Sequence, residues 1–311
     1  MNTTCLKKTE GVMGMRWLSL FSLLSMLSLL HLVKGIRRSF TNPRLVSRLY
    51  QTYKINGYEC NEVLIQIDDY KIKILEANMN TQEELINLAI ENEGNSITKD
   101  DVYGIVLWPA AKVVARKLIS DYKLDNLRVC EIGSGTGLVS LAVAMAGKNV
   151  KEVYATDYNP FCIELINKAI EIQRNEIECN ISTSIFDAKD FNHPLPSADI
   201  YCFADVLYDQ SLGVAVAKRI FEAIKNNKKV IIADAKTRLG RDFSDEFFHL
   251  LTLLCIGRQP MLDKLNELLL ADNRQPVSFT WVTGEAVQGE RDTLISTPDK
   301  TQTVPVGLLE L

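Results

Sequence analysis

The sequence predicts an α/β fold: a seven-stranded, doubly wound sheet with helices on both faces and its last strand antiparallel. Two observations lead to this prediction. Between residues 127 and 233, short apolar runs alternate with helical patterns, which is typical of parallel strands joined by crossover helices. The two apolar runs at 276–282 and 303–311 have no long helix between them, and strands connected in this way pair antiparallel.

The chain is expected to comprise three consecutive parts: a leader at residues 1–58, an N-terminal extension at 59–105 and a main domain at 106–311. In the extension, residues 62–67 and 70–75 alternate between apolar and polar side chains, which predicts a β-hairpin. A capping box that begins at Thr81 predicts a helix that ends near residue 92.

In the main domain, single residues mark where helices begin and end. Pro109 suits the first turn of a helix, Gly147 ends a helix of small residues, and Pro160 begins the next one. The expected strands before the two closing runs cover residues 127–132, 150–156, 180–186, 200–204 and 230–233. The expected helices cover residues 110–120, 138–146, 159–174 and 212–225, followed by a helical run at 243–271.

The leader differs from the rest of the chain in charge and hydropathy. Residues 1–58 contain nine Lys or Arg and one acidic residue, a net charge of +8. The remainder carries 26 basic and 38 acidic residues, a net charge of −12. The segment Trp17–Val33 is apolar apart from four serines and one histidine, and its length is at the lower limit for a membrane span. This asymmetry indicates that the two ends of the chain have different tasks.

A hydrophobic segment followed by a basic, acid-free stretch resembles the two-part leader of proteins sent to a plastid bounded by secondary membranes. A signal anchor at the endoplasmic reticulum is the second alternative, and a mitochondrial presequence is the third. If the leader is retained, residues 17–33 would attach the protein to a membrane.

Cysteine and histidine spacing bears on disulfides and metals. The seven cysteines are scattered and contain no C-x-x-C pair, which indicates reduced thiols rather than a disulfide framework. The three histidines do not pair at metal-ligand spacing, so no metal site is expected.

The stretch "VCEIGSGTGL" places a glycine-rich loop between a predicted strand and a predicted helix. Gly133, Gly135 and Gly137 allow a tight turn and a close approach of the backbone to a ligand, and Glu131 precedes them. The helix N-terminus adds the positive end of a dipole. The Lys and hydroxyl pair of a P-loop is missing, which disfavours a nucleoside triphosphate.

Two further acids follow the next predicted strands. Asp157 ends the second strand, where a carboxylate can accept hydrogen bonds from both ribose hydroxyls, and Asp187 ends the third, where it could accept from an adenine amino group. Because the carboxyl ends of parallel strands meet at one edge of the sheet, these acids should lie beside the glycine loop. The pattern predicts a nucleoside cofactor.

From about residue 55 to the C-terminus, the chain resembles the seven-β-strand (class I) S-adenosylmethionine-dependent methyltransferases, which have a Rossmann-like fold. More narrowly, it is similar to the family-16 protein-lysine methyltransferases. The resemblance rests on "DVYGIVLWPAA" (101–111), "EIGSGTGLVSLAVAMAG" (131–147), "YATDYNP" (154–160), "ADVLYD" (204–209) and the closing "VPVGLLEL".

The resemblance implies that S-adenosyl-L-methionine is the cofactor and assigns residues to its parts. Asp157 would hold the ribose, Asp187 would meet the adenine and Trp108 would form a wall of the pocket. The methionine end would be lined by Glu131, Gly133, Gly135 and Gly137. Members often carry a tryptophan after the third-strand acid, where this chain has Ala188.

The stretch Asp205-Val-Leu-Tyr208 follows the fourth predicted strand and bears on the methyl acceptor. A lysine amine has an ordinary pKa of about 10.4, so only a small fraction carries a lone pair at neutral pH. An apolar channel would lower that pKa. We expect Asp205 to orient the amine by a hydrogen bond and Tyr208 to wall the channel. Asp209 is expected to cap the helix that starts near Ser211.

The sequence therefore predicts an S-adenosyl-L-methionine-dependent N-methyltransferase that acts on a lysine of a protein substrate. Two alternatives remain open: a small-molecule amine as acceptor, and a membrane-tethered module that binds the cofactor without turnover. A nucleic-acid partner is disfavoured because the chain outside the leader is acidic. In addition, base-modifying enzymes usually carry Asn/Asp-Pro-Pro-Tyr where this chain has Asp205-Val-Leu-Tyr208.

Overall fold

The computed structural model describes residues 51–78, 80–82, 84–85, 88, 103–236, 256–285 and 303–311. The chain divides into two compact units, Met1–Arg48 and Leu49–Leu311, and all described residues belong to the second. The hydrophobic segment 17–33 and the rest of the leader up to residue 50 lie outside the described residues, so their targeting role stays a prediction. Within the described ranges, we find no helix that is both long and apolar enough to cross a membrane.

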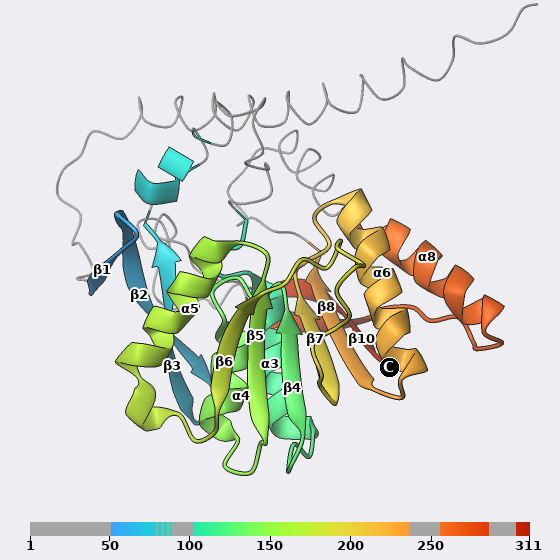
Figure 1. The fold of residues 1–311 in the computed structure, drawn as a ribbon, viewed down its shortest axis with the longest axis horizontal. Coiled ribbons are helices and arrows are strands. Elements are labelled where there is room, and N and C mark those ends of the chain that lie inside the picture. The colour runs from blue at the N-terminus through green and yellow to red at the C-terminus, as the bar shows by residue number, and fades with distance from the viewer. Residues whose placement is uncertain are drawn as a thin grey trace, which may run out of the picture. The chain divides into compact units, whose positions relative to one another are not determined.

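A seven-stranded sheet forms the centre of the second unit (Figure 1). Its strands are β4 (Arg128–Ile132), β5 (Glu152–Asp157), β6 (Ile181–Ile185), β7 (Ile200–Ala204), β8 (Lys229–Ala235), β9 (Thr280–Glu285) and β10 (Thr303–Glu310). The strand order is β6-β5-β4-β7-β8-β10-β9. Strands β4 to β8 are parallel, and β10 runs antiparallel to both β8 and β9. This confirms the predicted fold class, although β9 begins four residues after the predicted start at 276.

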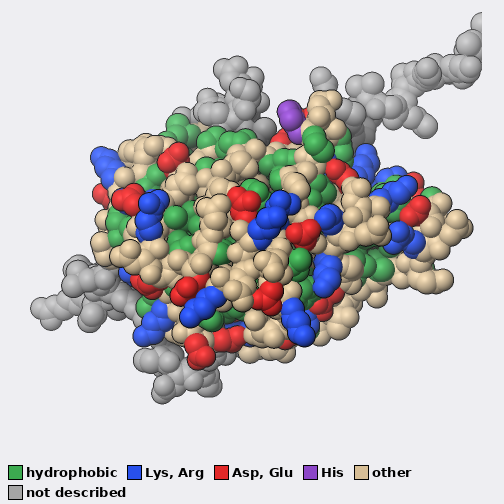
Figure 2. All heavy atoms as spheres, turned by 60° about the horizontal axis from the view of Figure 1, so that its bottom comes forward, with side chains coloured by type: hydrophobic (Ala, Val, Ile, Leu, Met, Phe, Trp, Pro, Cys, Tyr) green, Lys and Arg blue, Asp and Glu red, His purple; other side chains and the backbone are tan. Residues whose placement is uncertain are grey.

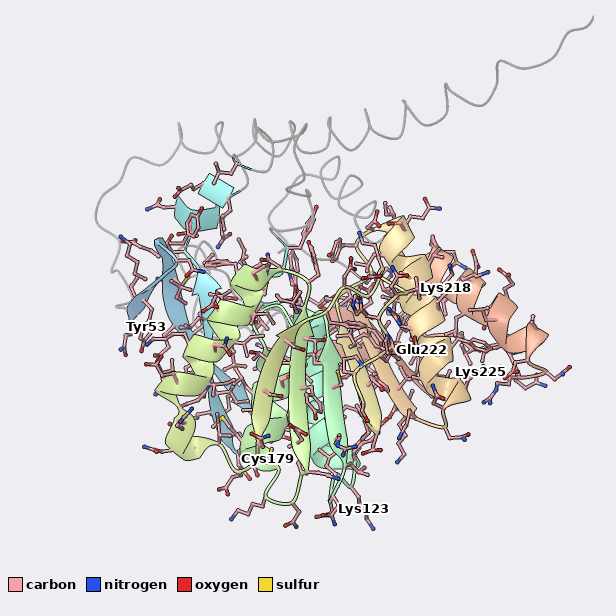
Figure 3. All side chains as sticks on the ribbon, in the orientation of Figure 1. Tyr53, Lys123, Cys179, Lys218, Glu222 and Lys225 are labelled. Atoms are coloured by element: carbon pink, nitrogen blue, oxygen red, sulfur yellow. The ribbon has the colours of Figure 1, made fainter. Side chains whose placement is uncertain are left out.

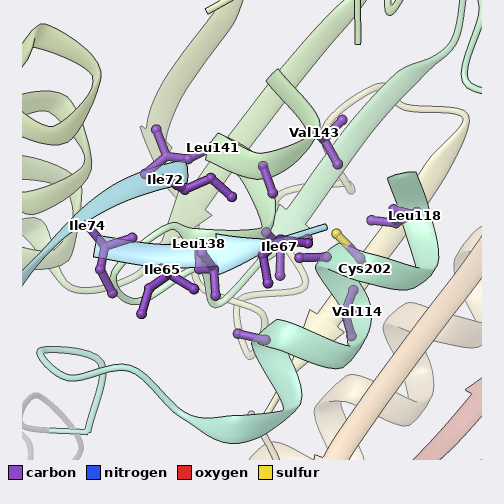
Figure 4. Packing of buried hydrophobic residues seen from close by; sticks show 14 of the residues in the cluster. Ile65, Ile67, Ile72, Ile74, Val114, Leu118, Leu138, Leu141, Val143 and Cys202 are labelled. Atoms are coloured by element: carbon purple, nitrogen blue, oxygen red, sulfur yellow. The ribbon is translucent and has the colours of Figure 1, made fainter. Parts of the chain in front are cut away.

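Helices cover both faces of this sheet. The first face carries α3 (Pro109–Asp121), α4 (Leu138–Ala146) and α5 (Pro160–Ile172), and the second carries α6 (Gln210–Lys225) and α8 (Arg258–Ala271). Neighbouring residues of a strand point to opposite faces. Val129 of β4 therefore joins the core of the first face, and Cys130 joins the core of the second. Figure 4 shows part of the first core, where Leu138 and Leu141 of α4 lie among residues of β2, β3 and α3. Residues 243–255 of the predicted helical run lie outside the described residues.

The N-terminal extension is a separate three-stranded sheet of β1 (Thr52–Ile55), β2 (Tyr58–Ile67) and β3 (Tyr70–Ala77). The predicted hairpin of β2 and β3 is confirmed. Strand β1 lies inside the predicted leader of residues 1–58, and it pairs with β2. Asn56 and Gly57 join these strands with φ angles of 48° and 93°, the conformation that a two-residue type I′ hairpin turn requires. A basic, acid-free composition does not prevent such pairing.

Side-chain hydrogen bonds attach the extension to the main domain and begin its helix. The buried amide of Gln173 accepts from the Lys73 backbone N–H at 3.0 Å and donates to the Lys73 carbonyl at 2.7 Å, so it pairs with β3 as another strand would. The helix that follows β3 includes Thr81, whose backbone N–H donates to the side chain of Asn78 at 2.9 Å. Asn78 therefore caps this helix in place of the predicted Thr81.

Candidate functional site

A cavity of about 910 Å³ of empty space, open solvent at its mouth included, lies at the carboxyl ends of the parallel strands. The sheet order reverses between β4 and β7, the place where ligands bind in open α/β sheets. The cavity brings together eight of the predicted site residues: Trp108, Glu131, Gly133, Gly135, Asp157, Asp187, Asp205 and Tyr208.

The glycine loop leaves room for a ligand by presenting bare backbone. Gly133 and Gly135 have φ angles of 71° and 51°, in the left-handed region that favours glycine. A Cβ atom on Gly133 would lie 2.7 Å from a methyl group of Val206, and one on Gly135 would lie 3.0 Å from the carbonyl oxygen of Gly104. Gly104 and Val206 both line the cavity, so a side chain at either glycine would collide with the cavity wall.

Gly137, the third glycine of the loop, is not among the residues that line the cavity, and its predicted place at the methionine end stays a prediction. It stands at the N-cap of α4 with a φ angle of 78°. A Cβ atom here would lie 2.7 Å from Ile166 of α5. The third glycine of the loop therefore serves the packing of α4 against α5.

Glu131 is fully buried at the end of β4 and holds the first turns of α4. Its Oε2 accepts hydrogen bonds from the backbone N–H of Ser140 at 2.9 Å and from the Ser140 hydroxyl at 2.6 Å. Burial raises the pKa of Glu131 to about 8, the hydrogen bonds from Ser140 oppose this, and the negative charge of Asp157 adds to it. At neutral pH a carboxyl group with this pKa is mostly protonated.

Asp157 closes the glycine loop against the end of β5. Its Oδ2 accepts from the backbone N–H of Gly135 at 2.8 Å, and its Oδ1 accepts from the N–H of Asn159 at 2.9 Å. The side chain is 4% exposed and lines the cavity, so the two hydrogen bonds set the direction of a carboxylate that faces the ligand space.

Asp187 stands at the first position of a turn after β6. Its Oδ1 accepts from the backbone N–H of Lys189 at 2.8 Å. The neighbouring Ala188 is buried and also lines the cavity. The small Ala188 side chain thus forms part of the cavity wall.

The segment before α3 crosses the cavity beside the glycine loop. Trp108, the N-cap of α3, donates from its indole N–H to the carbonyl oxygen of Tyr103 at 2.7 Å. The ring of Tyr103 stacks on that of Tyr208, with centroids 4.8 Å apart and planes at 29°. Sequence reasoning missed Tyr103, since nothing in its local pattern indicates a partner about a hundred residues away.

Asp205 follows β7 with a φ angle of 55°, and its carboxylate is 4% exposed. Its Oδ2 accepts from the backbone N–H of Ala110 at 2.6 Å, in the first turn of α3. Its Oδ1 accepts from the backbone N–H of Ala235 at 2.8 Å, at the end of β8. Asp205 therefore joins a helix N-terminus to a strand end, a structural task that the sequence did not predict.

Asp209 caps α6, as predicted. Its side chain accepts from the backbone N–H of Leu212 at 2.8 Å, and α6 begins at Gln210, two residues before the predicted range of 212–225. Among the described residues, no group of three or more His, Cys, Asp or Glu could hold a metal ion.

Comparison with known proteins identifies the family. The profile of a family described as lysine methyltransferase matches residues 82–253, more than half of the chain. Protein-lysine methyltransferase METTL21E of Bos taurus is 31% identical over 173 residues, which cover 52% of this chain and 58% of that protein. The protein of the same name from Mus musculus is 30% identical over 176 residues, 52% of this chain and 69% of that protein.

A solved structure of an arsenic(III) S-adenosylmethionine methyltransferase from Chlamydomonas reinhardtii covers 66% of this chain and 73% of its own, at 12% identity and a TM-score of 0.40. With 58% of the cattle protein covered, the present chain spans less than two thirds of the length of that relative. The extent of the profile match is decisive, and the chain belongs to the lysine methyltransferase family.

Proposed function

We propose that the protein is an S-adenosyl-L-methionine-dependent methyltransferase that modifies a lysine side chain of a protein substrate. One observation carries this proposal: a single cavity joins the glycine loop and Asp157 to the Asp205–Tyr208 motif. A cofactor and a methyl acceptor can thus meet in one cavity. The names of the METTL21E relatives support a protein lysine as acceptor.

The residues present fit S-adenosyl-L-methionine, the cofactor of this family. A side chain on Gly133 or Gly135 would collide with Val206 or Gly104, so the loop meets the cavity as bare backbone. Gly133, Gly135 and Glu131 would hold the methionine end, Asp157 the ribose and Asp187 the adenine. When bound, the cofactor supplies an electrophilic methyl group on a sulfonium.

At the acceptor end, side chains of this protein would prepare the amine. The walls contributed by Val206, Leu212 and Val216 are apolar, and such surroundings favour the neutral form of an amine over its charged form. The rings of Tyr103 and Tyr208 would confine the amine and exclude water, which improves its orientation for an in-line attack. The Asp205 carboxylate lines the same cavity and would orient the amine.

Charge distribution is consistent with a protein acceptor and gives no support to a nucleic acid. Basic and acidic side chains are interspersed on the face shown in Figure 2. A surface that neutralises phosphates needs clustered Lys and Arg. The chain outside the leader carries a net charge of −12, which would repel a polyanion.

The test is methyl transfer by the full chain from S-adenosyl-L-methionine labelled in its methyl group. The acceptor is a lysate of cells that lack the gene, separated afterwards into protein, nucleic acid and small molecules. We expect label in protein, recovered as methyllysine after hydrolysis, and none with a Tyr208→Ala variant that still binds S-adenosylhomocysteine. Label in the small-molecule or nucleic-acid fraction alone would contradict a protein acceptor. Absence of all transfer would favour a binding module.

A further inference from the structure

Arg219 of α6 is a buried cation outside the cavity, with 1% of its surface exposed. Its Nε donates to the carbonyl oxygen of Ala188 at 3.1 Å. One terminal nitrogen donates to the carbonyl oxygens of Asp190 at 2.6 Å and His193 at 2.8 Å. The other donates to the carboxylate of Glu222, one turn along the helix, at 2.7 Å. Three of the four hydrogen bonds thus end on backbone carbonyl groups of one loop, residues 187–195.

Glu222 adds a fourth attachment of the same loop. Its Oε1 accepts from the backbone N–H of Leu195 at 3.1 Å, while its Oε2 pairs with Arg219. Figure 3 shows Glu222 on α6 between Lys218 and Lys225. Two side chains of one helix therefore hold the loop 187–195 at four backbone positions.

Aromatic rings cover the same guanidinium group. The ring centroids of Phe186 and Phe191 lie 5.2 Å and 4.5 Å from the central carbon of Arg219. Cation–π contacts of this kind strengthen where water is excluded. The loop is thus attached to α6 through side chains as well as through its backbone.

This loop forms one wall of the cavity. Asp187, Ala188 and Lys189 all line it, and Val216, three residues before Arg219, lines it from α6. Ala188 offers a methyl group as its side chain, so the position of this wall depends on the backbone. That backbone accepts from Arg219 through the Ala188 carbonyl.

The chemistry of arginine suits this task and that of lysine does not. Removing a guanidinium group from water is costly unless hydrogen bonds and an opposite charge compensate. The planar fork of Arg219 reaches four acceptors in different directions, whereas an ammonium group is a compact point charge with three donors. A hydrophobic residue would fill the space with less desolvation, and it would leave three carbonyl groups without this donor.

We propose that Arg219 is a positioning residue that holds the 187–195 loop in the shape that recognises the adenine ring of the cofactor. With the loop held, the Asp187 carboxylate and the Ala188 backbone lie where they can form hydrogen bonds with the amino edge of the base. The proposal concerns the cofactor and does not depend on which acceptor is methylated. Its failure and that of the lysine proposal are therefore distinguishable.

The experiment measures binding to the full-length protein by calorimetry, using S-adenosylhomocysteine and S-inosylhomocysteine. The second compound has an oxo group in place of the adenine amino group. We expect the wild type to bind the adenine compound more tightly by about ten-fold. Arg219→Met should remove most of this preference by weakening S-adenosylhomocysteine about ten-fold, with S-inosylhomocysteine changed by less than about two-fold. Arg219→Lys should also lose the preference, because it keeps the charge but not the fork.

Lys218→Met is the matched control. Lys218 lies next to Arg219 and its Nζ also approaches the Phe191 ring, at 5.2 Å, but Lys218 is exposed. The Lys218→Met variant should therefore leave both affinities unchanged. If Arg219→Met does not fold, Glu222→Gln applies the same test more mildly, since it alters the bond to Leu195 on the half-exposed side of the network. Equal weakening of both compounds, an unchanged ratio in the variants that fold, or a wild type without preference would overturn the proposal.

Discussion

The two ends of the cavity are built in different ways. At the cofactor end, Asp157 bonds to the backbone of Gly135 and Asn159, and both partners belong to the same strand–loop–helix units as the motif residues. At the acceptor end, Asp205 bonds to residues 95 positions before it and 30 after it. The glycine loop and Asp157 at the cofactor end therefore form a local structure, whereas the acceptor end exists only when distant segments of the chain have assembled.

This difference implies different consequences of mutation. Changes at the cofactor end should act mainly on ligand binding, because the loop backbone forms the contact surface. Changes at the acceptor end should act on stability and transfer together, because the same carboxylate holds the fold and faces the cavity.

The largest effect is expected for Gly135→Arg at the cofactor end. A side chain here must enter the space next to the Gly104 carbonyl, and the φ angle of 51° adds strain. Calorimetry with S-adenosylhomocysteine should detect no binding. Gly57→Arg is the matched control, since Gly57 also has a positive φ, 93°, but nothing lies within 4 Å of its would-be Cβ. Equal loss of binding in both variants would show that backbone strain alone, rather than the close contact with Gly104, is responsible.

The second effect concerns Glu131 and depends on pH. Its folded-state pKa of about 8 exceeds its ordinary value of 4.5, so between these values the unfolded chain loses this proton more readily. The free energy of unfolding should therefore fall as pH rises through this window, by at most about 1.4 kcal/mol per pH unit from this group. Glutamine cannot titrate, so the free energy of unfolding of Glu131→Gln should rise relative to that of the wild type as pH increases over the same range.

Urea unfolding of both proteins between pH 5 and pH 8 measures this difference. Glu178→Gln, at an exposed position, controls for the loss of one acidic group. A difference between Glu131→Gln and the wild type that stays constant with pH would contradict the assignment.

At the acceptor end, Asp205→Asn should lower the free energy of unfolding by about 1–3 kcal/mol. The amide has one oxygen for the two backbone N–H groups of Ala110 and Ala235, so one of them would face an NH₂ group. Affinity for S-adenosylhomocysteine should change little, and methyl transfer should fall. Asp209→Asn is the matched control, because asparagine caps a helix as well as aspartate does. Full stability and full transfer in Asp205→Asn would show that the acceptor end does not depend on this carboxylate.

The smallest effect is expected for the Tyr103–Tyr208 stack. A double-mutant cycle of the two alanine variants should give a coupling of about 0.5–1.5 kcal/mol in the free energy of unfolding. Additive effects would mean that the two rings act independently. In that case Tyr103 would have no part in a shared wall of the acceptor channel.

Sequence patterns predicted the main domain well because parallel strands and crossover helices leave a strong local signal. The helix Leu138–Ala146 and the strand Ile200–Ala204 have the predicted bounds. The structure adds two features that the local patterns left out. The Asn56-Gly57 turn places β1 in the folded unit, and Gly137 has the same loop spacing as its neighbours but lies close to Ile166.

The sequence by itself determined the fold class, the family and eight residues of the cavity, because each follows from patterns within a short stretch of chain. The tertiary structure alone decided that Asp205 joins α3 to β8, that Tyr103 stacks on Tyr208 and that Arg219 holds the loop after β6. These contacts link segments that come together only when the sheet closes, and the order of its strands is set by packing across the whole domain.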